Sequence, residues 1–156
     1  EADETPRGVI VQDTAWDGYE EIPAWIMQGY GTMAMEAGEQ LKAQGCERPT
    51  HIFVQAGVGS LAGAVVGYFS NLYADNLPTF VVVEAEAAAC LYKGAAAGES
   101  GAAPFGALAA MMTMDEYKDL RNDIGLDENS KVLLFSTEGD TDPDRYKNIV
   151  WKGLDK

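Results

Sequence analysis

A glycine-rich turn between two apolar runs is the stretch of this sequence best suited to binding an anion. It lies within residues 50–68, THIFVQAGVGSLAGAVVGY, and its central residues are Gly57, Val58, Gly59 and Ser60. The first backbone amides of a helix lack partners inside the helix and lie at the positive end of its dipole, so they bind phosphate and similar anions. Glycines let the backbone approach such a ligand closely. An ordinary strand-to-helix turn without a ligand is the alternative, because glycines also serve tight turns.

This turn matches neither of two common nucleotide-binding patterns. No Gly-Lys-Ser/Thr follows it, as a Walker loop requires, and its glycine spacing only approximates the dinucleotide fingerprint. The residues alone therefore leave two interpretations open, an anion site of unspecified ligand and an ordinary strand-to-helix turn.

Polar residues follow two further apolar runs. Asp13 follows the β-branched run at residues 9–11, and Ser136 and Thr137 begin the cluster STEGD after the run VLLF at residues 132–135. In open α/β sheets, ligands bind at the carboxyl ends of the strands, so these residues are candidates for a site. For Asp13 the alternative is the capping of a turn, a position that aspartate favours.

Strand-like and helix-like segments alternate along the chain. The apolar, β-rich runs predict buried strands at residues 9–11, 52–54, 79–83 and 132–135. Apolar residues at three- and four-residue steps or capping patterns predict helices at residues 24–45, 60–69, 86–92, 102–114, 115–122 and 143–156. Alternating strands and helices predict a parallel sheet with right-handed crossovers, in a single α/β domain over residues 1–156.

Composition limits the classes of partner. The chain has 156 residues with 11 basic and 25 acidic side chains, and its net charge of -14 argues against nucleic acid or an anionic membrane. Cys46 and Cys90 have no CxxC spacing and His51 is the single histidine, so neither a disulfide framework nor a histidine metal site is predicted. The polar N-terminus and the two cysteines favour a cytoplasmic protein.

Three acidic pairs are candidates for a metal site. Hard cations need several oxygens that converge on one point, whereas these pairs are separated by predicted strands and loops. We therefore favour solvated or capping roles and predict no metal. The pairs are Glu20 with Glu21, Glu84 with Glu86, and Asp140 with Asp142.

Taken together, the polar clusters QDT, QAGVGS, GES and STEGD give the chain a family resemblance over nearly its whole length. It resembles the diaminopropionate ammonia-lyases, which are pyridoxal-phosphate enzymes of fold type II. The segment QDTAW followed by IPAWIMQGY is specific to that lyase group. QAGVGS is similar to the broader phosphate loop of threonine deaminases and tryptophan synthase β relatives. The resemblance implies the three-layer α/β/α large domain of that fold.

The resemblance also implies roles for individual residues. In such a site the glycine loop holds the phosphate of pyridoxal 5'-phosphate, through backbone amides and the hydroxyl of Ser60. Ser136, with Thr137 as the near alternative, would bind the pyridine nitrogen, and Asp13 would transfer a proton at the substrate α-carbon. The cofactor-binding residues implied in this way are Gly57, Val58, Gly59, Ser60, Ser136 and Thr137.

The implied reaction is α,β-elimination of ammonia from 2,3-diaminopropionate, which gives pyruvate and a second ammonia. The complete enzyme is expected to be a homodimer that acts on a small amino acid. A threonine or serine deaminase relative and a non-catalytic phosphate- or nucleotide-binding module are the alternatives.

The chain departs from the family pattern at two places. Family members carry the Schiff-base lysine upstream of QDTAW, and they have a long segment where only residues 93–98 stand here. We therefore expect a fragment that lacks an N-terminal region and an internal segment, and that is inactive alone. The lysines outside the matching context are Lys42, Lys93, Lys118, Lys131, Lys147, Lys152 and Lys156.

Overall fold

A parallel three-stranded sheet forms the centre of the structure. The structure, a computed structural model, describes residues 8–84 and 98–137 of the chain. Within these ranges the strand order is β2-β1-β3, with β1 (His51–Ala56) between β2 (Thr79–Glu84) and β3 (Val132–Leu134). The strands predicted at residues 52–54, 79–83 and 132–135 are thereby confirmed, although β3 ends one residue earlier than expected.

The register of the strands brings their carboxyl ends to one edge. His51 lies opposite Thr79 on one side and opposite Val132 on the other. All three strands run in the same direction, so the polar residues that follow them meet at the same end of the sheet.

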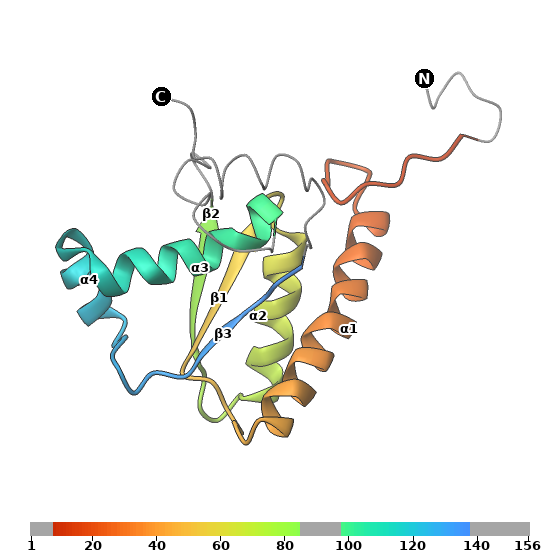
Figure 1. Ribbon diagram of the computed structural model, residues 1–156. Helices are drawn as coiled ribbons and strands as arrows, with labels where there is room; N and C mark the ends of the chain where they lie inside the picture. The colour runs from red at the N-terminus through yellow and green to blue at the C-terminus, as the bar shows by residue number, and fades with distance from the viewer. Residues whose placement is uncertain (1–7, 85–97, 138–156) are drawn as a thin grey trace.

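Helices cover both faces of the sheet. Helices α1 (Glu21–Ala43) and α2 (Ser60–Leu72) lie on one face, and α3 (Gly98–Thr113) lies on the other (Figure 1). A 3₁₀ turn, η3 (Asp115–Tyr117), and the short helix α4 (Lys118–Asp123) follow α3. None of the helices in the described ranges is long and apolar enough to cross a membrane.

The core consists of two apolar clusters, one on each side of β1. Ile52 and Val54 point toward α1 and α2, where they pack with Phe69, whereas Phe53 packs with Met111 on the α3 side. Successive side chains of a strand point to opposite faces, so the run of apolar residues fills both clusters. The predicted three-layer α/β/α architecture is confirmed.

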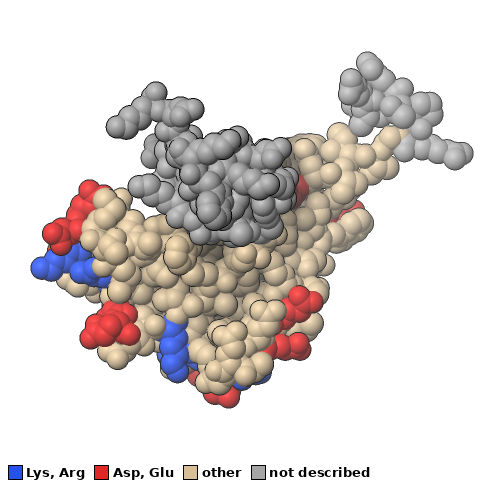
Figure 2. All heavy atoms as spheres, viewed as in Figure 1, with Lys and Arg blue, Asp and Glu red and all other residues tan. Residues whose placement is uncertain are grey.

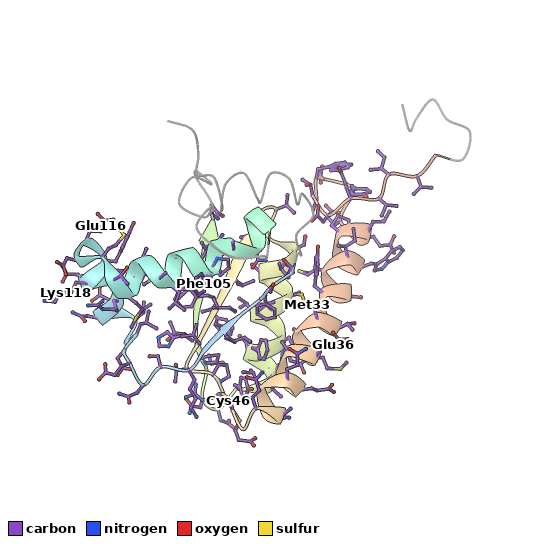
Figure 3. The ribbon with its side chains drawn as sticks, in the orientation of Figure 1. Met33, Glu36, Cys46, Phe105, Glu116 and Lys118 are labelled. Carbon is purple, nitrogen blue, oxygen red and sulfur yellow. The ribbon has the colours of Figure 1, made fainter. Side chains whose placement is uncertain are left out.

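Helix α1 packs on α2 through one side only. Met33 contacts the core on that side, whereas Glu36 is exposed on the other (Figure 3). Gly38 is buried against α2, where a Cβ atom would lie 3.8 Å from the Tyr68 hydroxyl and 3.9 Å from Leu72. These are ordinary van der Waals distances, so an alanine would fit at this position and steric crowding does not explain the glycine.

Charged side chains on the face seen in Figure 2 gather around α4 and along the lower edge of the molecule. Acidic and basic groups are intermixed there, which is typical of a solvated surface.

The predicted strand at residues 9–11 is wrong. Val9 and Val11 are 71% and 69% exposed, and no strand pairs with them among the described residues. Instead, the Tyr19 hydroxyl holds this segment, donating to the Ile10 carbonyl at 2.9 Å and accepting from the Gln12 amide at 3.0 Å. The β preference of a β-branched run reflects packing against neighbouring strands, and this run has no such neighbour.

Several helix boundaries also differ from expectation, since α1 begins at Glu21 and α2 extends to Leu72. Helix α3 begins at Gly98, so Pro104 lies inside the helix and not in its first turn. The helix predicted at residues 115–122 begins as the 3₁₀ turn η3, with Met114 as its N-cap, and α4 itself starts only at Lys118. The helices predicted at residues 86–92 and 143–156 lie outside the described residues.

Truncation of Phe69 tests the importance of the α2 side of the core. Phe69 is fully buried and its ring contacts Tyr68, Tyr73 and Phe135. We expect Phe69→Ala to lower the free energy of unfolding by about 3–5 kcal/mol, measured by urea titration, because it leaves a cavity. Leu72→Ala on the same helix, where Leu72 is 41% exposed, is the matched control and should cost less than about 1 kcal/mol. Equal losses for the two variants would contradict this assignment of the core.

Candidate functional site

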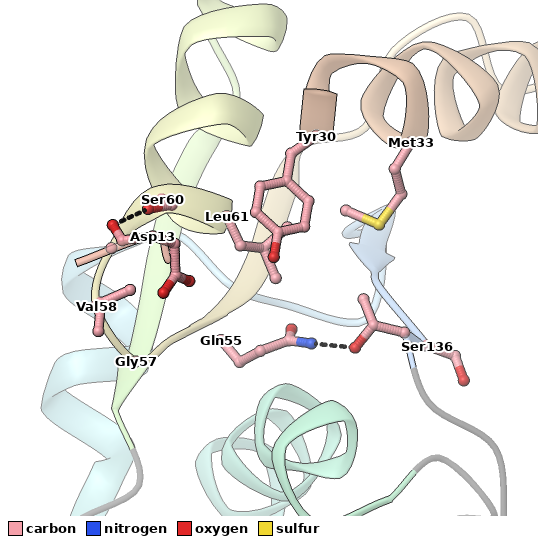
Figure 4. A pocket seen from close by; sticks show the side chains of 11 residues that line it. Asp13, Tyr30, Met33, Gln55, Gly57, Val58, Ser60, Leu61 and Ser136 are labelled. Atoms are coloured by element: carbon pink, nitrogen blue, oxygen red, sulfur yellow. Dashed lines mark hydrogen bonds between the residues drawn. The ribbon is translucent and has the colours of Figure 1, made fainter. Parts of the chain in front are cut away.

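A pocket of about 550 Å³ lies at the carboxyl ends of β1 and β3, beside the start of α2 (Figure 4). It brings together every residue that the sequence singled out as catalytic or cofactor-binding, although these residues come from three separate segments. Four further lining residues were not predicted. The lining residues are Asp13, Tyr30, Met33, Gln55, Gly57, Val58, Gly59, Ser60, Leu61, Ser136 and Thr137.

The start of α2 provides the anion-binding end of this pocket. Gly59 is the N-cap residue with φ of 95°, and no side chain caps the helix. The first turn carries no acidic residue, and the Gly63 amide is bonded to the Gly59 carbonyl at 2.8 Å. The amides before Gly63 therefore remain available to an anion, with the helix dipole in support.

Ser60 joins this helix start to the segment that carries Asp13. Its hydroxyl donates to the backbone carbonyl of Asp13 at 3.1 Å. In this structure the hydrogen of Ser60 is directed to Asp13, and the expected donor role of this hydroxyl toward a phosphate stays a prediction. The backbone amide of Ser60 remains one of the unpaired amides at the start of α2 that are available to an anion. The bond holds Asp13 beside the glycine turn, where its carboxylate faces the pocket (Figure 4).

Gln55 is a site residue that the sequence analysis missed. It lies in β1, is only 7% exposed, and its Nε2 donates to the Thr137 hydroxyl at 2.8 Å. Its carbonyl oxygen Oε1 is buried without a hydrogen-bond partner among the described residues. The signal was present in the sequence, because a single glutamine directly follows the apolar run Ile52, Phe53 and Val54. A buried polar side chain needs a partner, and the strand's own backbone does not supply one.

Helix α1 forms the opposite wall of the pocket. Tyr30 and Met33 are three residues apart, so both project from the same side of the helix. The helical spacing of the apolar residues predicts this helix, but it does not indicate which of them lie beside the pocket and not in the core. Leu61, in the first turn of α2, adds a further apolar surface.

Other candidates fall outside the described pocket. The lining residues include no lysine, and the described residues contain no group of three or more potential metal ligands. Within the cluster STEGD, Ser136 and Thr137 line the pocket, whereas Asp140 and Asp142 lie outside the described residues.

Comparison with known proteins assigns the chain to a family. A family model described as "Pyridoxal-phosphate dependent enzyme" matches residues 7–134. The chain belongs to this family of pyridoxal-phosphate-dependent enzymes. The cofactor of the family is the one that the sequence resemblance implied.

The relatives bear out the resemblance to the ammonia-lyases. The chain is 37% identical to a diaminopropionate ammonia-lyase of Salmonella typhimurium, over 96% of this chain and 54% of the relative. An apo crystal structure of the Escherichia coli diaminopropionate ammonia-lyase superposes with a TM-score of 0.77 at 38% identity, covering 92% of this chain and 49% of that one. A second structure of that enzyme, with an aminoacrylate-PLP azomethine reaction intermediate, gives 0.76 at 33% identity and covers 92% and 52%.

The chain spans about half the length of the relatives it matches. The alignment to the Salmonella lyase runs over 217 residues, more than the 156 of this chain, so the lyase has residues inside the aligned region without a counterpart here. The location of that difference at residues 93–98 stays a prediction, because residues 85–97 are outside the described ranges.

The described residues fit pyridoxal phosphate. An uncapped helix start suits its phosphate, a hydroxyl pair after β3 suits its ring nitrogen, and the pocket between them carries one carboxylate and apolar walls. A backbone cradle of this kind needs Gly59, since few other residues adopt a φ of 95° without strain.

Substitution of Gly59 tests this cradle. We expect Gly59→Ala to cost roughly 1–2 kcal/mol of stability and to weaken phosphate-ester binding by at least about tenfold, because the turn must move away from its present geometry. The measurement is titration with pyridoxine 5'-phosphate, followed by ligand fluorescence.

Gly67→Ala is the matched control for this substitution. Gly67 lies inside α2 and has open space around it, so alanine should raise stability by up to about 1 kcal/mol and leave binding unchanged. Unchanged binding by Gly59→Ala would contradict the proposed cradle.

Proposed function

We propose that this chain forms the phosphate- and ring-binding part of an ammonia-lyase that acts on 2,3-diaminopropionate. The observation that carries the proposal is the pocket itself, which is lined by an uncapped helix start, by Asp13 and by the Ser136–Thr137 hydroxyls. The named relatives support the choice of substrate, because two diaminopropionate ammonia-lyases match over more than nine-tenths of this chain.

Each group in the pocket has a distinct task in this proposal. Bound pyridoxal phosphate supplies an electron sink that stabilises negative charge at the substrate α-carbon. The amides of residues 57–61 bind the phosphate, and the hydroxyl of Ser136 or Thr137 donates to the ring nitrogen. The carboxylate of Asp13 moves a proton at the α-carbon. Tyr30, Met33 and Leu61 keep water from the reacting atoms.

The reaction that follows is loss of ammonia from the β-carbon, after which hydrolysis gives pyruvate and a second ammonia. A hydroxyl at the ring nitrogen, in place of a carboxylate, leaves that nitrogen neutral and favours elimination over transamination. We further propose that the complete enzyme is a cytoplasmic homodimer in amino-acid catabolism.

Two alternatives make different predictions. A threonine or serine deaminase would share the glycine turn, but the segment QDTAW and the helix IPAWIMQGY favour the diaminopropionate lyases. A nucleotide-binding module would be stabilised by ATP and not by pyridoxal phosphate. A thermal-shift comparison of the two ligands should show stabilisation by pyridoxal phosphate alone.

The isolated 156-residue chain should bind the cofactor without turnover. We expect saturable binding of pyridoxal phosphate but no pyruvate from diaminopropionate, because no lysine lines the described pocket. Borohydride reduction followed by peptide mapping is the check. Pyruvate release, or stoichiometric trapping of the cofactor on one lysine of this chain, would contradict the proposal that the Schiff-base lysine is supplied by a segment outside these 156 residues.

The role of Asp13 must be tested in a protein that turns over substrate. This requires a longer polypeptide that also contains the upstream segment with the Schiff-base lysine. Asp13→Asn should lower kcat for pyruvate release by about 10²–10⁴-fold, since the amide transfers no proton. The affinity for pyridoxine 5'-phosphate should stay within about twofold of the parent protein, because the Ser60 bond uses only the backbone of Asp13. Asp17→Asn, outside the pocket lining, is the matched control, and an equal loss of kcat there would contradict the assignment.

A further inference from the structure

Gln55 combines two properties that set it apart from the rest of β1. It is a polar side chain in the central strand of the sheet, and one of its two polar atoms is buried without a partner. An apolar side chain of similar length would remove this unfavourable oxygen. An unsatisfied buried group that lines a pocket is characteristic of a residue retained for a ligand and not for stability.

The hydrogen bond from Gln55 determines what the Thr137 hydroxyl can do. The Nε2 group can only donate, so at 2.8 Å it occupies a lone pair of the Thr137 oxygen. The hydrogen of that hydroxyl is then free for another acceptor, and accepting one bond polarises the O–H group into a stronger donor. Thr137 is therefore arranged to donate into the pocket.

Ser136 lacks this arrangement. Its side chain turns away from Gln55 in Figure 4, and no hydrogen bond joins its hydroxyl to another residue in the described part of the chain. In the same view the carbonyl of Gln55 and the ring of Tyr30 face each other across the pocket.

We propose that Gln55 is a positioning residue that makes Thr137, and not Ser136, the hydrogen-bond donor to the cofactor's ring nitrogen. A donor at that point requires an unprotonated nitrogen as acceptor. Gln55 thereby selects the neutral ring, which is the form suited to elimination. The inference rests on the proposed function, because it takes the ligand of the pocket to be a pyridine phosphate.

The test compares two probes that differ at one ring position. Pyridoxine 5'-phosphate has no aldehyde, so it binds without forming a Schiff base, and its analogue with C–H in place of the ring nitrogen cannot accept the bond. We expect the chain to bind the first about tenfold more tightly than the second, the effect of one hydrogen bond. Gln55→Met and Thr137→Val should each abolish this preference, and the double variant should lose no more than either single one.

Three controls separate positioning from a structural role. Ser136→Ala, and Ser70→Ala on α2 outside the pocket lining, should keep the preference. Gln55→Met should have a melting temperature no lower than that of the parent chain, because the substitution removes the unpartnered oxygen. The pKa of the ring nitrogen of bound pyridoxine 5'-phosphate, followed by absorbance, should be lower in the parent chain than in Gln55→Met.

The outcomes distinguish the two proposals. If the parent chain binds neither probe, the proposed cofactor site and this inference both fail. If it binds both probes and Gln55→Met retains or increases the preference, only the inference fails. Loss of the preference in Ser136→Ala, with retention in Thr137→Val, would reverse the assignment of the donor, and this comparison holds even if Gln55→Met does not fold.

Discussion

The burial of β1 on both faces is the constraint on which the rest of this structure depends. Ile52, Phe53 and Val54 are fully buried, with neighbouring strands on either side and helices above and below. A strand in this position has no access to solvent except at its ends. Polar groups that serve a ligand must therefore lie where β1 stops, and the pocket begins at Gln55 and Gly57 for that reason.

The same constraint determines the two ends of the pocket. The chain leaves β1 through a glycine with φ of 95° and immediately begins α2, so the positive end of the helix dipole is fixed beside the strand. Strand β3 pairs with the other side of β1 and delivers two hydroxyls to the same edge. An anion-binding end and a hydroxyl end thus face each other across β1, which matches a ligand with a phosphate and a ring nitrogen.

Gln55 illustrates how a functional site departs from the rules that stabilise the core. Its neighbours in β1 are apolar and packed, whereas Gln55 leaves one oxygen without a partner. Proteins tolerate such local losses of stability chiefly where a ligand is bound. The hydroxyl of Ser60, in contrast, has a partner, because it donates to the Asp13 carbonyl and ties the Asp13 segment to α2.

The sequence by itself determined the parallel α/β class, three of the four predicted strands, the glycine turn and the family. These features depend on local periodicity, on the conformational freedom of glycine and on motifs whose residues are adjacent in the sequence. The strand at residues 9–11 was wrong because strand formation requires a partner, which no local pattern reports. Tyr30, Met33 and Gln55 were missed as site residues for a related reason: whether a side chain faces the core or a pocket depends on where its element ends relative to the others. Only the tertiary structure decided that Gln55 bonds Thr137 across 82 positions of sequence, because the pairing of β3 with β1 places them together.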